Sequence, residues 1–156
     1  GVAAFQMLVG VGSFLGLTLG GRAADRGAGG MSVTLGFLGL AAAAALHSLE
    51  LARAGAPGAG AYAIVGLAVL TGSTALFSIL PVIQTRLIQR APASAPLALA
   101  FNASSASLGQ AFGAALGGTL LVQGGALSVT FAGGAVALAA VIFWRLTHRA
   151  GAPAAG

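Results

Sequence analysis

The amino-acid sequence predicts an all-α integral membrane protein with five transmembrane helices. Its 156 residues include only seven basic and two acidic side chains, so 6% of the chain is charged, whereas a soluble domain carries about 25%. Apolar side chains make up 58% of the residues, and 26 glycines add to them. The chain therefore has too little polar surface for a water-soluble fold of its length, and a bilayer is the solvent that suits it.

Five apolar windows are long enough to cross a bilayer core about 30 Å thick, which takes roughly 20 helical residues. In chain order, they cover about residues 2–20, 31–49, 61–82, 97–121 and 127–146. Glycine, proline and charged residues, which separate helices, collect between them at 21–30, 51–60, 83–96 and 123–126. We therefore expect a transmembrane bundle over residues 1–148 and a cytoplasmic tail over residues 149–156.

The arginines orient this bundle, because short cytoplasmic loops collect basic residues. With five crossings, one side of the membrane receives Arg22, Arg26, Arg86, Arg90, Arg145 and Arg149. Only Arg53 falls on the opposite side. We expect the amino end outside the cell and the carboxyl end in the cytoplasm. The use of arginine without lysine, together with many alanines, favours a GC-rich bacterium and hence its inner membrane.

The composition also argues against several functional classes. The chain has no cysteine, two histidines and two carboxylates, which is too few for a thiolate metal site or for paired-carboxylate catalysis. We therefore expect no enzyme, no metal and no cofactor. The arginines form separated pairs without interleaved aromatic residues, so nucleic acid is not an expected partner. The chain opens at Gly1 directly on an apolar run, which predicts that it is cut at its beginning.

Two windows share one glycine pattern, GxxxGxxxGG. It places Gly12, Gly16 and Gly20 on one face of the first helix and Gly109, Gly113 and Gly117 on one face of the fourth. Small residues spaced by four let another backbone approach closely, so we expect each face to meet a partner helix. The two helices cross in opposite directions. The shared pattern therefore indicates an inverted repeat of about three spans, as in secondary transporters, with one span missing before the first.

Three segments resemble the major facilitator superfamily, and within it the bacterial drug and sugar efflux proton antiporters of the arabinose-efflux-permease type. Residues 21–28, Gly-Arg-Ala-Ala-Asp-Arg-Gly-Ala, resemble the GxxxDRxG signature between the second and third helices of each half, with Ala28 in place of its second glycine. Residues 81–92 resemble the end of the tenth span, and residues 101–118 resemble the eleventh. The resemblance covers nearly the whole chain and implies helices eight to twelve of a C-terminal half.

This resemblance implies further expectations. The loop with Asp25 between Arg22 and Arg26 would gate the transporter by latching one conformation; the alternative is a solvated loop whose charges balance each other. The first seven helices would be missing from this fragment, and both glycine faces would be where the present bundle meets the missing one. Small-molecule substrate, protons and the lipid bilayer are the remaining expected partners.

Polar side chains inside the spans are candidates for a substrate cavity, because they are costly in lipid unless they face a cavity or another helix. The candidates are Asn102, Ser105 and Gln110 in the fourth window, Thr71, Thr74 and Ser78 in the third, and Gln6 in the first. The three residues of the third window recur at i, i+3 and i+7, on one stripe. Ser and Thr also bond to their own backbone or pack between helices, and this alternative stays open.

Proton coupling requires a titratable group within the membrane, but no carboxylate lies inside any window. His47 is the nearest candidate, and an interfacial histidine near Glu50 is the alternative. The coupling acid is therefore expected in the missing part. The one tryptophan, Trp144, falls beside Arg145 at the cytoplasmic interface, where we expect it to act as a membrane anchor.

The sequence thus predicts part of a secondary active transporter that exports drugs, sugars or other small metabolites, coupled to protons, by alternating access. The alternative is a free-standing five-span scaffold or subunit that packs on a partner through its glycine faces.

Overall fold

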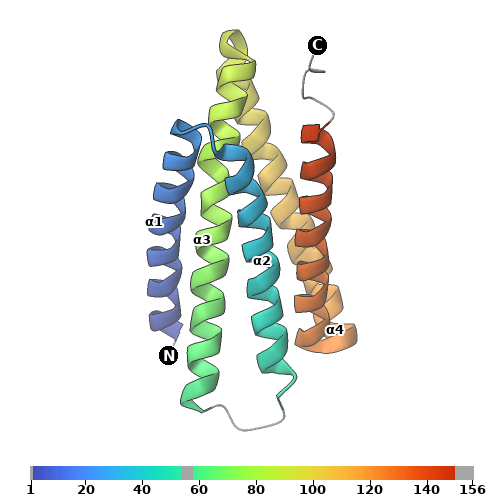
Figure 1. The fold of residues 1–156 in the computed structure, drawn as a ribbon. Helices are drawn as coiled ribbons and strands as arrows, with labels where there is room; N and C mark the ends of the chain where they lie inside the picture. Colours follow the sequence, from blue (N-terminus) through green and yellow to red (C-terminus); the bar gives the residue numbers. More distant parts are fainter. Residues whose placement is uncertain (1, 54–57, 150–156) are drawn as a thin grey trace.

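A computed structural model describes residues 2–53 and 58–149 of the protein. The chain forms α1 (Val2–Asp25), α2 (Gly29–Leu51), α3 (Ala59–Arg90), the short 3₁₀ helix η1 (Pro92–Ser94) and α4 (Ala95–Arg149) (Figure 1). No strand occurs within these two ranges, so the all-α fold class is confirmed for them. The predicted tail, apart from its first residue, lies outside the described residues, as does part of the predicted 51–60 break.

Glycine and proline set the breaks between the helices. Gly27 has a φ of 71° and follows α1, where the amide of Gly27 bonds the carbonyl of Ala24 (3.2 Å) and the amide of Ala28 bonds that of Ala23 (2.9 Å). This pair of bonds closes a helix with a left-handed residue, a conformation that glycine adopts without strain. Proline marks the end of α3, because Pro92 follows this helix and begins η1.

The helices extend beyond the apolar windows. α3 continues through residues 83–90, which the sequence analysis assigned to a break, because no residue there stops a helix before Pro92. Pro81 lies inside α3, and the helix continues past it. α1 likewise continues to Asp25, five residues past the predicted window. The apolar windows therefore cover only part of α1 and α3, and the helices end near the next glycine or proline.

α4 consists of two helical arms joined at Gly125, whose backbone (φ 73°, ψ −178°) is not helical. We call residues 95–124 the first arm and residues 126–149 the second arm. Figure 1 shows the arms running in opposite directions, and the Ser128 hydroxyl ties them by donating to the carbonyl of Leu120 (2.8 Å). This reversal lies within the predicted 123–126 break.

The helices pack around α3, with α1 and α2 on either side of it (Figure 1). α2 also packs against the second arm of α4. The small core consists of Val33, Ile79 and Val82, with Phe37 and Trp144 among the residues packed against it.

Large apolar side chains cover the outside of the bundle. Phe112, Val122 and Phe143 are 75%, 87% and 70% exposed. A bilayer solvates such an apolar exterior, whereas water does not. By length and composition, α1 to α4 are each able to cross a membrane, which supports a membrane protein.

The charged residues gather at the two ends of the bundle. Arg22 and Arg90 lie in the last turns of α1 and α3, and the contact of Trp144 with Gly30 brings the end of α4 to the start of α2. The six arginines predicted to share one side therefore lie toward one end. Arg53 follows α2 at the opposite end.

Candidate functional site

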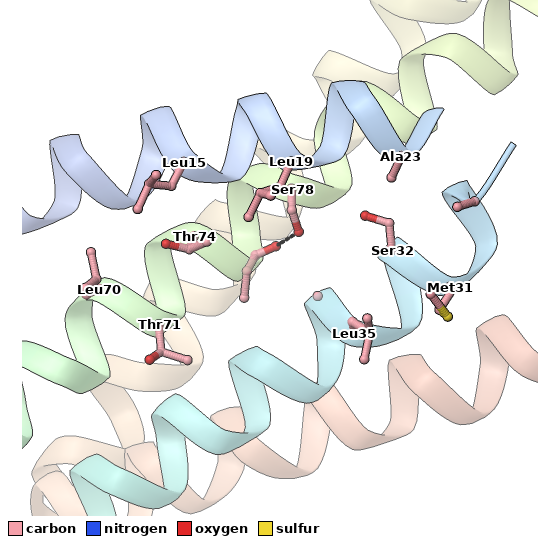
Figure 2. Close-up of a pocket in the computed structure, with 13 residues that line it drawn as sticks. Leu15, Leu19, Ala23, Met31, Ser32, Leu35, Leu70, Thr71, Thr74 and Ser78 are labelled. Carbon is pink, nitrogen blue, oxygen red and sulfur yellow. Dashed lines mark hydrogen bonds between the residues drawn. The ribbon is translucent and has the colours of Figure 1, made fainter. Parts of the chain in front are cut away.

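The polar stripe of α3 faces a groove between α1, α2 and α3. The groove has a volume of about 540 Å³, and Thr71, Thr74 and Ser78 all line it. Figure 2 shows these side chains on α3, with α1 on one side and α2 on the other. The groove lies toward the turn between α1 and α2, because its α1 and α2 residues are within 15–23 and 28–36. The structure thus brings three of the seven predicted cavity residues together.

Apolar side chains form the walls of the groove. Leu15 and Leu19 come from α1, and Met31 and Leu35 come from α2 (Figure 2). Ser32 of α2 adds a fourth hydroxyl to the lining. Sites for small organic ligands combine apolar walls with a few polar groups that orient the ligand, and they measure about 300–1,000 Å³. The groove matches this description in its volume and its lining.

The hydroxyl groups of the stripe differ in their hydrogen bonding. Ser78 is buried and donates to the carbonyl of Ala75 in its own helix (2.8 Å). Thr71 and Thr74 are half-buried, and their side chains make no hydrogen bond within the described part of the chain. The Ser78 hydroxyl thus bonds the backbone of its own helix, which was the alternative to a cavity role. The two threonine hydroxyls remain available to a molecule in the groove.

The glycine face of α1 is what brings α1 against α3 and forms one wall of the groove. Gly12, Gly16 and Gly20 are buried. A Cβ atom on Gly16 would collide with the backbone carbonyl of Thr74, and one on Gly20 would collide with that of Ser78. This face is therefore filled by a helix of the same chain. The expectation that it meets a separate, missing bundle is wrong, because α3 already occupies the space.

The corresponding face on the first arm of α4 is open. A Cβ atom on Gly109 or Gly113 would have no neighbour within 4 Å, and one on Gly117 would meet only Val129 of the second arm, at 3.8 Å. Ser105 and Gln110 are exposed on this arm, and Asn102 is half-buried near its start. The structure does not bring these three residues into the groove of α3.

The remaining predicted residues lie apart from the groove. Gln6 is exposed on the first half of α1. Asp25, Arg22 and Arg26 are exposed at its end, and none of them forms an ion pair within residues 2–53 and 58–149. The one ion pair in those ranges joins Glu50 to Arg53 at the other end of the bundle (3.2 Å).

Trp144 connects three helices, a role that the sequence analysis missed. Its indole N–H donates to the carbonyl of Gly30 at the start of α2 (3.2 Å), and its ring packs against the core residues of α2 and α3. The guanidinium of Arg86 lies over the ring, 4.9 Å from its centroid. The interpretation of Trp144 as an anchor alone is incomplete, because it also holds the second arm of α4 to α2 and α3.

Ser48 and Thr130 form a second connection that was missed. Their hydroxyls lie 2.7 Å apart and join α2 to the second arm of α4. Neighbouring Ser and Thr in separate spans carry no sequence signal for pairing, because the pairing depends on which helices lie side by side.

Metal-ligating chemistry has no support within the described ranges, where no group of three or more His, Cys, Asp or Glu residues could hold an ion. His47, the candidate nearest to a proton-coupling group, has its Nδ1 atom 2.9 Å from the carbonyl of Ala43 in its own helix. It lies outside the groove.

Comparisons of this chain with protein-family models, with curated proteins and with solved structures find no match.

Proposed function

We propose that the chain is part of a secondary active transporter of the major facilitator type, which moves small molecules across a bacterial inner membrane by alternating access. The observation that carries the proposal is the stripe of Thr71 and Thr74, whose hydroxyls face a groove of about 540 Å³ between three apolar helices. Hydroxyls at bilayer depth without a partner are costly. Their place in a groove is readily explained if a substrate supplies the hydrogen bonds.

The chemistry of the groove favours a particular class of substrate. Leucine and methionine walls bind apolar or aromatic surface, and two or three hydroxyls offer neutral hydrogen bonds. No charged residue lines the groove, so the proposed substrate is a largely apolar molecule with one or two hydrogen-bonding groups. Drugs and other small metabolites of this kind fit better than highly hydroxylated sugars.

The open face of α4 supports a larger assembly. Gly109, Gly113, Ser105 and Gln110 form a polar and small-residue surface on an otherwise apolar arm. Such faces in membranes pack against other helices. We propose that the N-terminal helices of the same transporter cover this face, that the arginine-rich end of the bundle is cytoplasmic, and that protons drive export through an acid in those helices.

Transport by the product of the complete native reading frame tests this proposal. Everted membrane vesicles would be supplied with fluorescent neutral aromatic compounds that carry one or two hydrogen-bonding groups, and uptake would be followed with and without a proton gradient. We expect gradient-dependent uptake that a protonophore abolishes. The substitution Thr71→Val/Thr74→Val keeps the shape of both side chains and removes both hydroxyls, so we expect it to raise KM for hydrogen-bonding substrates about 10-fold.

The matched control is Thr147→Val, because Thr147 is exposed at the end of α4 and bonds the carbonyl of Phe143 in its own helix (2.9 Å). It should leave KM unchanged. Uptake that ignores the proton gradient, or equal KM values for both variants, would refute the assignment of the groove. A start codon directly before Gly1 together with no uptake would favour the five-span scaffold.

A further inference from the structure

A small pocket with two arginines and the tryptophan lies at the arginine-rich end of the bundle. It has a volume of about 150 Å³ and is lined by Ile83, Arg86, Leu87 and Arg90 of α3 and by Trp144 of α4. We call it the Arg–Trp pocket. It shares no residue with the groove between α1, α2 and α3.

One guanidinium of this pocket has a fixed position. The Trp144 ring is held by its hydrogen bond to the carbonyl of Gly30 (3.2 Å) and by packing against the core. Arg86 lies over that ring, with its guanidinium carbon 4.9 Å from the ring centroid, which is within the range of a cation–π contact. A charge held in place before binding loses little entropy when a ligand arrives.

Arg90 supplies a second guanidinium beside the first. It follows Arg86 by four residues on α3, so the two side chains lie on one face of the helix, and Arg90 is exposed. The five residues that line the pocket include no acid. The chain has only two carboxylates, Asp25 and Glu50, and Glu50 pairs with Arg53 at the opposite end. Arginines thus outnumber acids at this end of the bundle, where Asp25 is the one acidic side chain of the sequence.

The pocket also has an apolar side, and it lies near the ends of α3 and α4, where a spanning helix meets the lipid headgroups. Ile83 and Leu87 alternate with the arginines along α3. Tryptophan and arginine near the ends of spans lie at headgroup level, where arginine extends its charge toward the phosphates. The volume corresponds to about five water molecules and is below that of sites for drug-sized ligands. It suits a single phosphate group whose attached chains leave along apolar helix surface.

We propose that the Arg–Trp pocket binds the phosphate of an anionic phospholipid in the cytoplasmic leaflet. Arg86 and Arg90 donate to the phosphate oxygens, and Ile83 and Leu87 contact the first methylene groups of the lipid. Basic pockets between spans on the cytoplasmic side are known to take such headgroups. The proposal needs the membrane insertion and orientation given above, but it does not depend on transport.

The single tryptophan makes the pocket directly observable, because all indole fluorescence comes from Trp144. The full chain would be reconstituted in phosphatidylcholine vesicles that contain either brominated phosphatidylglycerol or brominated phosphatidylcholine. Bromine quenches indole fluorescence at contact, so the ratio of quenching, normalised to unbrominated lipid, gives the relative binding constant. We expect phosphatidylglycerol to be preferred by about 5-fold for each arginine that faces it.

Three variants show which arginines cause the preference for phosphatidylglycerol. Arg90→Gln removes an exposed side chain that the core does not need, and it should lower the preference about 5-fold. Arg86→Gln/Arg90→Gln should abolish it. Arg22→Gln/Arg26→Gln is the matched control, with the same loss of charge at the same end but outside the pocket, and it should keep the preference.

The proposal is overturned if both brominated lipids quench equally, or if the control loses the preference as fully as the pocket variants do. Inorganic phosphate at millimolar concentration distinguishes the two sources of a phosphate group. It should neither displace brominated phosphatidylglycerol nor change the fluorescence in pure phosphatidylcholine. Displacement by the free ion would show a phosphate site in place of a lipid site. A lipid preference in a protein that does not transport would leave this inference standing while the proposed function fails.

Discussion

The two glycine motifs make a matched test of helix packing, since they share one sequence pattern but have different surroundings. Gly16 lies against α3, and a Cβ atom there would meet the carbonyl of Thr74 and lie 3.0 Å from both the Phe77 Cβ atom and the Ser78 amide nitrogen. Two of these three neighbours are backbone atoms, which cannot rotate away. At Gly113, the counterpart of Gly16 in the motif of α4, a Cβ atom would have nothing within 4 Å.

The substitution Gly16→Ala should therefore separate α1 from α3. Inserting a methyl group into a packed interface costs about 1–3 kcal/mol, whereas replacing glycine by alanine inside a helix favours the helix by up to about 1 kcal/mol. The second effect is common to Gly16→Ala and Gly113→Ala, so the difference between the variants isolates the packing. We expect Gly16→Ala to be less stable than Gly113→Ala by about 2 kcal/mol, close to 30-fold in the unfolding equilibrium.

The absence of cysteine from the chain allows a direct assay. Val2 and Tyr62 are 76% and 58% exposed near the starts of α1 and α3, and cysteines at both positions would carry a donor and an acceptor dye. Energy transfer between them, followed during titration with SDS in detergent micelles, reports when α1 leaves α3. Equal midpoints for Gly16→Ala and Gly113→Ala would refute the packing argument, as would a larger loss for Gly113→Ala.

Three further substitutions test the other connections in the bundle, each by its SDS unfolding midpoint relative to the wild-type chain. Trp144→Phe removes the indole N–H that bonds α2 and weakens the cation–π contact, so it should cost about 1–2 kcal/mol; no change would show that the tryptophan serves only as an anchor. Gly125→Ala places a side chain at a φ of 73°, which should cost about 1–3 kcal/mol, while the helical Gly118→Ala costs nothing; equal effects would contradict the turn between the arms. Ser48→Ala and Thr130→Val should each cost about 0.6 kcal/mol and the double variant little more than either; additive losses would show that the two hydroxyls do not interact.

The sequence predicted those features that local chemistry decides. Composition predicted an apolar helical bundle, and the predicted breaks contain the residues at which the helices stop or turn, Gly27, Pro92 and Gly125. The spacing of Thr71, Thr74 and Ser78 placed them on one stripe, and the structure shows that stripe facing the groove. In each case the signal lies within a few turns of one helix.

Features that depend on which helices are neighbours could not be predicted. The same glycine spacing occurs at Gly16 and Gly113, yet α3 covers one face and leaves the other open. Trp144 bonds Gly30 across 114 positions in the sequence, and no local pattern marks that pair. The helix continuing through residues 83–90 was missed for another reason, because its polar residues end the apolar window without ending the helix.

We propose that this bundle is one part of a larger transporter whose other helices cover the open face of α4. The sequence of the native gene upstream of Gly1 tests this proposal. We expect an open frame that adds about seven apolar spans, with an acidic residue inside at least one of them to couple protons. A stop codon and a genuine start just before Gly1 would contradict it, and would leave a separate membrane protein whose open glycine face binds another chain.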